Sequence, residues 1–229
     1  MTRAVILADG ASPTRADLDE AWPGWADRIG LVIAADGGAR LATPLGLAID
    51  RWVGDGDSVD PATLERLRAS GVVIERMDVD KDESDTELAI DRALRAGATD
   101  ITVIGALGGP RLDHALANIG LLALAALAGV PARLLDPAAR VSLVRAPGPG
   151  GAPVVAVLRG RPGDVVSLLT LGEDVLGVTT EGLRYPLRDE PLLAGPARGL
   201  SNVRLSDIAR ITVRRGRLLV VESPVTLRA

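Results

Sequence analysis

The sequence contains no cysteine, no phenylalanine, one histidine and one lysine among 229 residues. Without cysteine, the chain cannot form disulfides, a thiolate nucleophile, an iron–sulfur cluster or a cysteine-ligated zinc site. Its single histidine, His114, also excludes a metal centre built from several imidazoles. Any metal ion bound by this chain must therefore be held mainly by oxygen ligands, as Mg²⁺, Mn²⁺ and Ca²⁺ are.

The chain also lacks long hydrophobic runs and an excess of basic residues. Its longest apolar run, residues 119–130, is twelve residues long, whereas a membrane-spanning helix needs about 20. The N-terminal apolar run ends at Asp9, too early for the hydrophobic region of a signal peptide. The net charge is −4, and nucleic-acid binders present a basic face to phosphates. We therefore expect a cytoplasmic protein that binds neither membranes nor nucleic acids.

The first 136 residues alternate short apolar runs with helical patterns, which predicts a mostly parallel, Rossmann-like sheet with helices on both faces. The spacing of Ser84 and Glu87 is that of a capping box at a helix start. Strands are expected at residues 4–8, 31–35, 52–53, 72–74, 101–104 and 133–135. Helices are expected at residues 61–70, 84–96 and 112–128.

The pattern changes after residue 136. Residues 146–151 form a connector rich in proline and glycine, which neither a helix nor a central strand would tolerate. Short β-branched runs separated by glycine and proline follow, and Arg215-Gly216 predicts a hairpin between the last two. The sequence therefore predicts an α/β domain over residues 1–140 and a smaller all-β domain over residues 141–229.

Acidic residues follow the expected strands of the first domain. They lie in Asp36-Gly37-Gly38, in residues 54–58 and in residues 78–87, where six of ten side chains are acidic. The carboxyl ends of parallel strands meet at one edge of a sheet, so these carboxylates should converge. Two like charges ~4 Å apart repel by about 4 kcal/mol at an effective dielectric constant of ~20, which a divalent cation would relieve. Taken singly, each segment could instead be an ordinary turn or a solvated loop.

A second candidate site follows the strand expected at residues 101–104. The glycine-rich turn at residues 105–109 enters a helix, and free N–H groups at a helix start favour anions. Arg111 adds a guanidinium suited to phosphate oxygens. His114 falls in the first helical turn, where a capping or surface role is a simpler interpretation than a general base. The sequence contains neither a Walker A motif nor a dinucleotide-binding G-x-G-x-x-G after the first strand.

In order, these motifs resemble those of the thiamine pyrophosphokinase (thiamine diphosphokinase) family. The resemblance extends over residues 5–221 and rests on residues 35–39, 54–58, 80–89, 108–118, 182–187 and 199–202. It implies an α/β domain that binds ATP and carries out catalysis, and a β-sandwich domain that binds thiamine and forms a homodimer. It also implies transfer of the pyrophosphoryl group of ATP to the hydroxyethyl group of thiamine, giving AMP and thiamine diphosphate.

The resemblance assigns roles to individual residues. It implies that Asp55, Asp57 and Asp85 are catalytic and bind Mg²⁺. Thiamine contacts are expected from Tyr185, Ser201 and Asn202. The implied ATP-binding residues are Asp36, Gly37, Gly38, Ser58, Lys81, Asp82, Ser84, Gly108, Gly109, Arg111, Asp113 and His114. The chain departs from the family pattern at Pro110, which separates Gly109 from Arg111, and at Val203, where many relatives carry glutamate.

Two alternatives stay open at this point. One is a pyrophosphokinase acting on another small alcohol, such as a hydroxymethyl-pterin. The other is a non-catalytic nucleotide-binding relative. The motifs at residues 182–187 and 199–202 favour thiamine as the acceptor. The retained acidic residues Asp55, Asp57 and Asp85 favour catalysis, because a chain without it need not keep carboxylates that repel one another.

Overall fold

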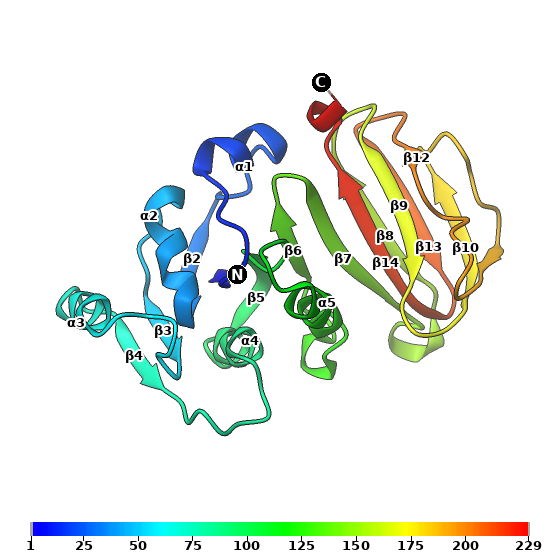
Figure 1. Ribbon diagram of the computed structural model, residues 1–229. Helices are drawn as coiled ribbons and strands as arrows, with labels where there is room; N and C mark the ends of the chain where they lie inside the picture. Colours follow the sequence, from blue (N-terminus) through cyan, green and yellow to red (C-terminus); the bar gives the residue numbers. More distant parts are fainter. Residues whose placement is uncertain (1, 229) are drawn as a thin grey trace. The chain divides into compact units, whose positions relative to one another are not determined.

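The computed structural model describes residues 2–228, and the chain divides into two compact units, Met1–Pro137 and Ala138–Ala229 (Figure 1). We call them unit 1 and unit 2. Among residues 2–228, no helix is both long enough and apolar enough to cross a membrane.

Unit 1 is built on a parallel sheet of six strands in the order β6-β5-β1-β2-β3-β4, which confirms the predicted α/β fold. The strands are β1 (Thr2–Leu7), β2 (Ile29–Ala35), β3 (Arg51–Gly54), β4 (Val73–Arg76), β5 (Ala98–Ile104) and β6 (Ala132–Asp136). The helices are α1 (Arg15–Ala21), α2 (Ala42–Leu45), α3 (Pro61–Ala69), α4 (Asp85–Arg95) and α5 (Leu112–Leu121), with 3₁₀ helices η1 (Asp36–Leu41) and η2 (Ala125–Leu127).

Both faces of the central strands are buried. Successive strand residues point to opposite faces, and residues 4–7 of β1 are all 0% exposed. On one face, Val5 and Leu7 pack against Leu18 of α1 and Leu45 of α2. The other face is covered by α4, which contacts β1, β2, β3 and β5. This double burial explains why the strands read as continuous apolar runs rather than as alternating patterns.

The helix expected over residues 112–128 is wrong in length. Helix α5 ends at Leu121, and a 3₁₀ turn, η2, follows after a short break. The amides of residues 122–124 bond to carbonyls three residues back, as in a tightening helix end. Gly120 lies at this point, and glycine is a poor helix former, so the Ala- and Leu-rich composition does not carry the helix further.

Unit 2 is a sandwich of two antiparallel sheets, ordered β12-β9-β14-β7 and β11-β10-β13-β8, as the predicted all-β class requires. Leu168 and Leu218 of the first sheet pack with Val178 and Ile211 of the second in one buried core. The strands are β7 (Ala139–Ala146), β8 (Val154–Arg159), β9 (Val165–Thr170), β10 (Val175–Glu181), β11 (Glu190–Leu192), β12 (Asn202–Val203), β13 (Ile208–Val213) and β14 (Gly216–Ser223), with 3₁₀ helices η3 (Pro149–Gly151) and η4 (Val225–Arg228).

The hairpin predicted at Arg215-Gly216 is wrong. Strand β13 pairs with β8 and β10, whereas β14 pairs with β7 and β9, so the turn carries the chain from one sheet to the other. Both strands direct buried aliphatic side chains, such as Ile211 and Leu218, into the shared core. A tight turn between two β-rich runs is compatible with either arrangement, and packing across the sandwich selects the crossing.

Candidate active site

Asp36 fastens the loop that follows β3 to the end of β2. It has a left-handed backbone (φ 42°) and is 5% exposed. Its carboxylate accepts hydrogen bonds from the backbone N–H groups of Gly56 (3.1 Å) and Ser58 (3.2 Å). Its carbonyl accepts a bond from the indole Nε1 of the fully buried Trp52 at 3.0 Å. The predicted ATP-binding residues Asp36 and Ser58 are therefore held against each other.

Close approach of neighbouring atoms explains the three glycines that surround Asp36, two after it in the sequence and one at the end of β3. A Cβ at Gly38 would collide with the carbonyl oxygen of Leu7 in β1, and one at Gly37 would lie 2.5 Å from Cγ of Asp9. A Cβ at Gly54, the last residue of β3, would lie 2.8 Å from Cβ of Asp36. The Asp-Gly-Gly segment therefore packs directly on the carboxyl ends of β1 and β3.

Three carboxylates converge at this edge of the sheet. Asp36, Asp55 and Asp57 each offer an oxygen, and these oxygens lie within 4.8 Å of one another. Asp85, at the start of α4, lies outside this group and is joined to it through Lys81. The ammonium Nζ of Lys81 lies 3.1 Å from Oδ2 of Asp55 and 3.2 Å from Oδ1 of Asp85. The only lysine in the sequence thus sits among the carboxylates.

The protonation equilibria of these groups reflect burial and charge. Burial raises the pKa of both Asp36 and Asp85. The backbone N–H of Asp57 and the ammonium of Lys81 hold the pKa of Asp55 below its usual value. Burial lowers the pKa of Lys81, but its bonds to Asp55 and Asp85 more than offset this, so the net shift is upward.

The residues present fit a hard divalent cation. Asp36, Asp55, Asp57 and Asp85 outnumber the one ammonium that pairs with two of them, so the group carries an excess of negative charge that a cation would neutralise. The donor atoms are all oxygens, and a site with only oxygen donors favours Mg²⁺ over softer metal ions. Asp36, Asp55 and Asp57 are close enough together to share one ion.

Arg40, which no sequence motif marked as a site residue, lies at the same edge of the sheet, beside the turn after β1. Its guanidinium bonds to Asp9 (Nε–Oδ1, 2.6 Å), to the carbonyl of Gly10 and to Ser12. The turn after β1 is also paired with the turn after β5, because the N–H of Gly10 donates to the carbonyl of Gly105 at 2.7 Å. Arg40 lies four residues after Asp36, within the same 3₁₀ helix, and that proximity was the available signal.

The glycine-rich turn after β5 leads into α5 as expected. Gly108 and Gly109 both have positive φ (71° and 80°) and are exposed, and no side chain caps the first turn of α5. Arg111 binds the neighbouring Asp113 with both arms of its guanidinium (2.9 and 2.6 Å). This bond holds the pKa of Asp113 at about 2. The guanidinium that we expected to meet phosphates is thus paired with a neighbouring carboxylate.

Three further predicted ATP-binding residues lie at the starts of α4 and α5 or in the loop before α4. Ser84 is the N-cap of α4, where its Oγ accepts a bond from the N–H of Glu87 at 3.2 Å, which confirms the predicted helix start. Asp82 and His114 are exposed. Their predicted roles at an ATP site stay predictions.

In unit 2, the two predicted acceptor motifs lie side by side. The side chain of Asn202 binds the backbone of Tyr185 twice, accepting from its N–H (3.0 Å) and donating to its carbonyl (2.7 Å). Asn202 is 7% exposed, whereas the ring of Tyr185 is largely exposed. Ser201 has a left-handed backbone (φ 59°), and its N–H donates to Oγ of Ser167 at 3.0 Å. Asn202 therefore holds the two motifs together, and Tyr185 and Ser201 face outward.

Comparison with known families matches both parts of the chain. Residues 25–131 match the family described as "Thiamin pyrophosphokinase, catalytic domain". Residues 155–218 match "Thiamin pyrophosphokinase, vitamin B1 binding domain". Thiamine pyrophosphokinase of Bacillus subtilis is 26% identical over 218 residues, which cover 95% of this chain and 97% of that protein.

Solved structures give the same result. The crystal structure of the B. subtilis thiamine pyrophosphokinase matches with a TM-score of 0.80 at 25% identity, covering 98% of this chain and 99% of that chain. The yeast enzyme shares the fold, with a TM-score of 0.73 at 15% identity over 98% of this chain and 87% of that chain. The two domain matches, in this order on one chain, show that it belongs to the thiamine pyrophosphokinase family of enzymes.

Proposed function

We propose that this chain is a thiamine diphosphokinase, which transfers the pyrophosphoryl group of ATP to the hydroxyethyl oxygen of thiamine. The products are thiamine diphosphate, AMP and the proton of the hydroxyl group. The observation that carries the proposal is the group of Asp36, Asp55 and Asp57 with Lys81, held at the carboxyl edge of a sheet in a chain that matches both domains of the family.

The donor part of the reaction belongs to unit 1. Asp55 and Asp57 would hold Mg²⁺ with Asp36, whose oxygens lie within reach of the same ion, and Asp85, joined to Asp55 through Lys81, would complete the set. The ion would neutralise phosphate charge. Lys81 would exchange its carboxylate partners for phosphate oxygens, as a compact point charge can. Gly37, Gly38, Ser58, Asp82, Ser84, Gly108, Gly109, Arg111, Asp113 and His114 complete the proposed ATP-binding set, with exposed N–H groups at the start of α5 as an anion site.

In the chemical step, the protein contributes mainly by aligning the reacting groups and neutralising their charge. The hydroxyl oxygen of the acceptor attacks the β-phosphorus, and the bond to the oxygen bridging the α- and β-phosphorus breaks as AMP leaves. Asp85 would orient the hydroxyl and accept its proton as the new bond forms, because its carboxylate lies beside the proposed ion site, joined to it through Lys81. Asp57 is the alternative proton acceptor.

The acceptor part belongs to unit 2. Tyr185, an exposed residue, offers an aromatic face for a cationic thiazolium or a pyrimidine. Ser201, which is exposed, and Asn202 would contact the pyrimidine ring, and Asn202 also holds the backbone of Tyr185 through two hydrogen bonds. A homodimer is part of the proposal, because the half-exposed Val155 and Val157 of β8 form an apolar strip that a second copy would cover. The cytoplasmic location stays a prediction.

The test is an end-product assay on the purified full chain with ATP, Mg²⁺ and either thiamine or a hydroxymethyl-pterin. We expect AMP and thiamine diphosphate in equal amounts with thiamine, and no turnover of the pterin. Formation of ADP instead of AMP would refute pyrophosphoryl transfer. Asp57→Asn should lower turnover by about a thousandfold or more without changing the unfolding temperature. Glu83→Gln, an exposed acidic residue of the neighbouring loop, is the matched control and should keep full activity.

A further inference from the structure

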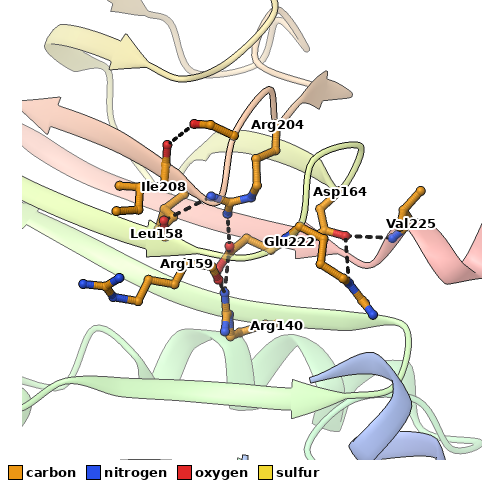
Figure 2. Close-up of polar contacts among 10 residues, drawn as sticks. Arg140, Leu158, Arg159, Asp164, Arg204, Ile208, Glu222 and Val225 are labelled. Carbon is orange, nitrogen blue, oxygen red and sulfur yellow. Dashed lines mark hydrogen bonds and ion pairs between the residues drawn. The ribbon is translucent and has the colours of Figure 1, made fainter. Parts of the chain in front are cut away.

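Unit 2 encloses an arginine that the proposed mechanism does not use. The side chain of Arg204 is 0% exposed, and that of its partner Glu222 is 3% exposed. Nη2 of Arg204 lies 2.6 Å from Oε1 of Glu222, and Nη1 donates to the carbonyl of Leu158 at 3.0 Å. Figure 2 shows this guanidinium directed at Glu222 and Leu158. Arginine is seldom buried so completely, and its burial calls for a physical reason.

Glu222 is shared with a second arginine. Arg140 of β7 binds both carboxylate oxygens of Glu222, each at 2.8 Å, and also donates to the carbonyl of Arg159 at 2.7 Å (Figure 2). A buried ion pair contributes little net stability, because desolvation of the charges offsets their attraction. The value of such a pair lies in the geometry that it imposes.

The backbone of Arg204 belongs to the ladder that joins the two acceptor motifs. We call this the acceptor ladder, residues 182–185 paired with residues 202–205. Arg204 lies opposite Leu183, and the N–H of Arg184 donates to the carbonyl of Val203 at 2.9 Å. The N–H of Leu205 donates to the carbonyl of Gly182 at 2.9 Å. The side-chain bonds of Asn202 to Tyr185 continue the same ladder outward.

The acceptor ladder is held by hydrogen bonds both at the protein surface and in the interior of unit 2. At the surface, Ser201 keeps its left-handed backbone while its N–H bonds to Ser167. A non-glycine residue holds such a conformation only where its surroundings fix it. Below it, the N–H of Arg204 donates to the carbonyl of Asp164 (2.9 Å), and the guanidinium reaches Leu158 in β8 and Glu222 in β14. Arg204 thus ties the base of the ladder to a strand of each sheet.

We infer that Arg204 is a positioning residue for the acceptor. Through Glu222 and Leu158 it fixes the acceptor ladder in the sandwich, and the ladder presents Tyr185 and Ser201. This inference rests on the proposed function, because it assigns the ladder to thiamine. In this inference, Arg204 has a role that Arg140 does not have. Arg140 binds the same carboxylate but lies on β7, outside residues 182–185 and 202–205 of the acceptor ladder.

The test compares three variants of the full chain with the wild type. In Arg204→Met, we expect the KM for thiamine to rise about tenfold or more, while the KM for ATP stays within about twofold, because the latter site lies in unit 1. Arg204→Lys should show a smaller rise in the KM for thiamine than Arg204→Met. A lysine ammonium can bind Glu222 but cannot bind Glu222 and the carbonyl of Leu158 at the same time. Arg140→Met should leave the KM for thiamine within about twofold, even where its unfolding temperature falls as far as that of Arg204→Met.

The outcomes separate this inference from the proposed function. An active wild type whose Arg204→Met variant keeps its KM for thiamine would overturn the role of Arg204 alone. Equal rises in both KM values, or an equal rise in Arg140→Met, would show a merely structural role and would also overturn it. If Arg204→Met does not fold, Arg204→Lys is judged by the same two KM values. A wild type without thiamine-dependent AMP formation would overturn both the proposed function and this inference.

Discussion

Replacing Gly54 by alanine tests whether Asp36 must stay where the structure places it. The added methyl group would lie 2.8 Å from Cβ, 2.9 Å from Oδ1 and 3.0 Å from Cα of Asp36, closer than ordinary van der Waals contact. Asp36 cannot retreat easily, because it is buried and its carboxylate is bound by Gly56 and Ser58. The backbone at Gly54 is not in the left-handed region, so the clash is the whole effect.

The expected magnitude follows from the contacts. Overpacking of a buried site costs about 1–3 kcal/mol, and a displaced Asp36 would also strain its two bonds to the loop that carries Asp55 and Asp57. A shift of about 1 Å in groups that align a reaction can lower its rate by about a hundredfold. We therefore expect Gly54→Ala to unfold at a lower denaturant concentration and to lose about a hundredfold in kcat/KM.

Gly97→Ala is the matched control for this experiment. Gly97 has a positive φ of 79°, and nothing lies within 4 Å of an added Cβ. Alanine there costs about 1–2 kcal/mol of backbone strain, similar to the cost at Gly54 but without contact to the carboxylates. Denaturant unfolding and AMP formation are measured on both variants. Full activity in Gly54→Ala, or an equal loss in Gly97→Ala, would refute the reasoning.

Three further predictions concern a phosphate contact, an ion pair and a helix. Lys81→Ala should raise the KM for ATP about tenfold, the equivalent of one charge-assisted hydrogen bond, and should raise the KM for thiamine far less. Steady-state kinetics measure both values, and a larger rise in the KM for thiamine would exclude a phosphate role for Lys81. Burial raises the pKa of Glu75, but its bonds to Arg92 and Arg51 outweigh burial and lower it overall. Glu75→Gln should therefore lower the free energy of unfolding by about 1–2 kcal/mol at pH 7. This difference from wild type should shrink as the pH falls below 4.5, the ordinary pKa of glutamate. A difference that persists in unfolding curves measured in acid would contradict this. Gly120→Ala should stabilise the chain by about 0.5–1 kcal/mol, because the methyl group meets nothing within 4 Å and φ is not positive; a lowered unfolding temperature would count against it.

The strand–helix alternation and the place of the acidic residues were readable from the sequence. Both follow from local patterns, because a strand buried on two faces is a run of apolar residues and a parallel sheet brings its carboxyl ends to one edge. Asp36, Asp55 and Asp57 were each expected at that edge and lie within reach of one ion. Lys81 was distinctive as the only lysine, and it bridges Asp55 and Asp85.

Other features depend on contacts between distant segments, and no local pattern encodes them. Strands β13 and β14 occupy different sheets although the turn between them is short, since packing across the sandwich, not the turn, decides the pairing. Asn202 is buried and bonds to the backbone of Tyr185, 17 residues away. Arg140 meets Glu222 across 82 residues. The order of residues along the chain thus determined which chemical groups this protein has and at which edge of the sheet they gather. The folded structure decided which of them face solvent and which hold others in place, because those roles depend on three-dimensional distance.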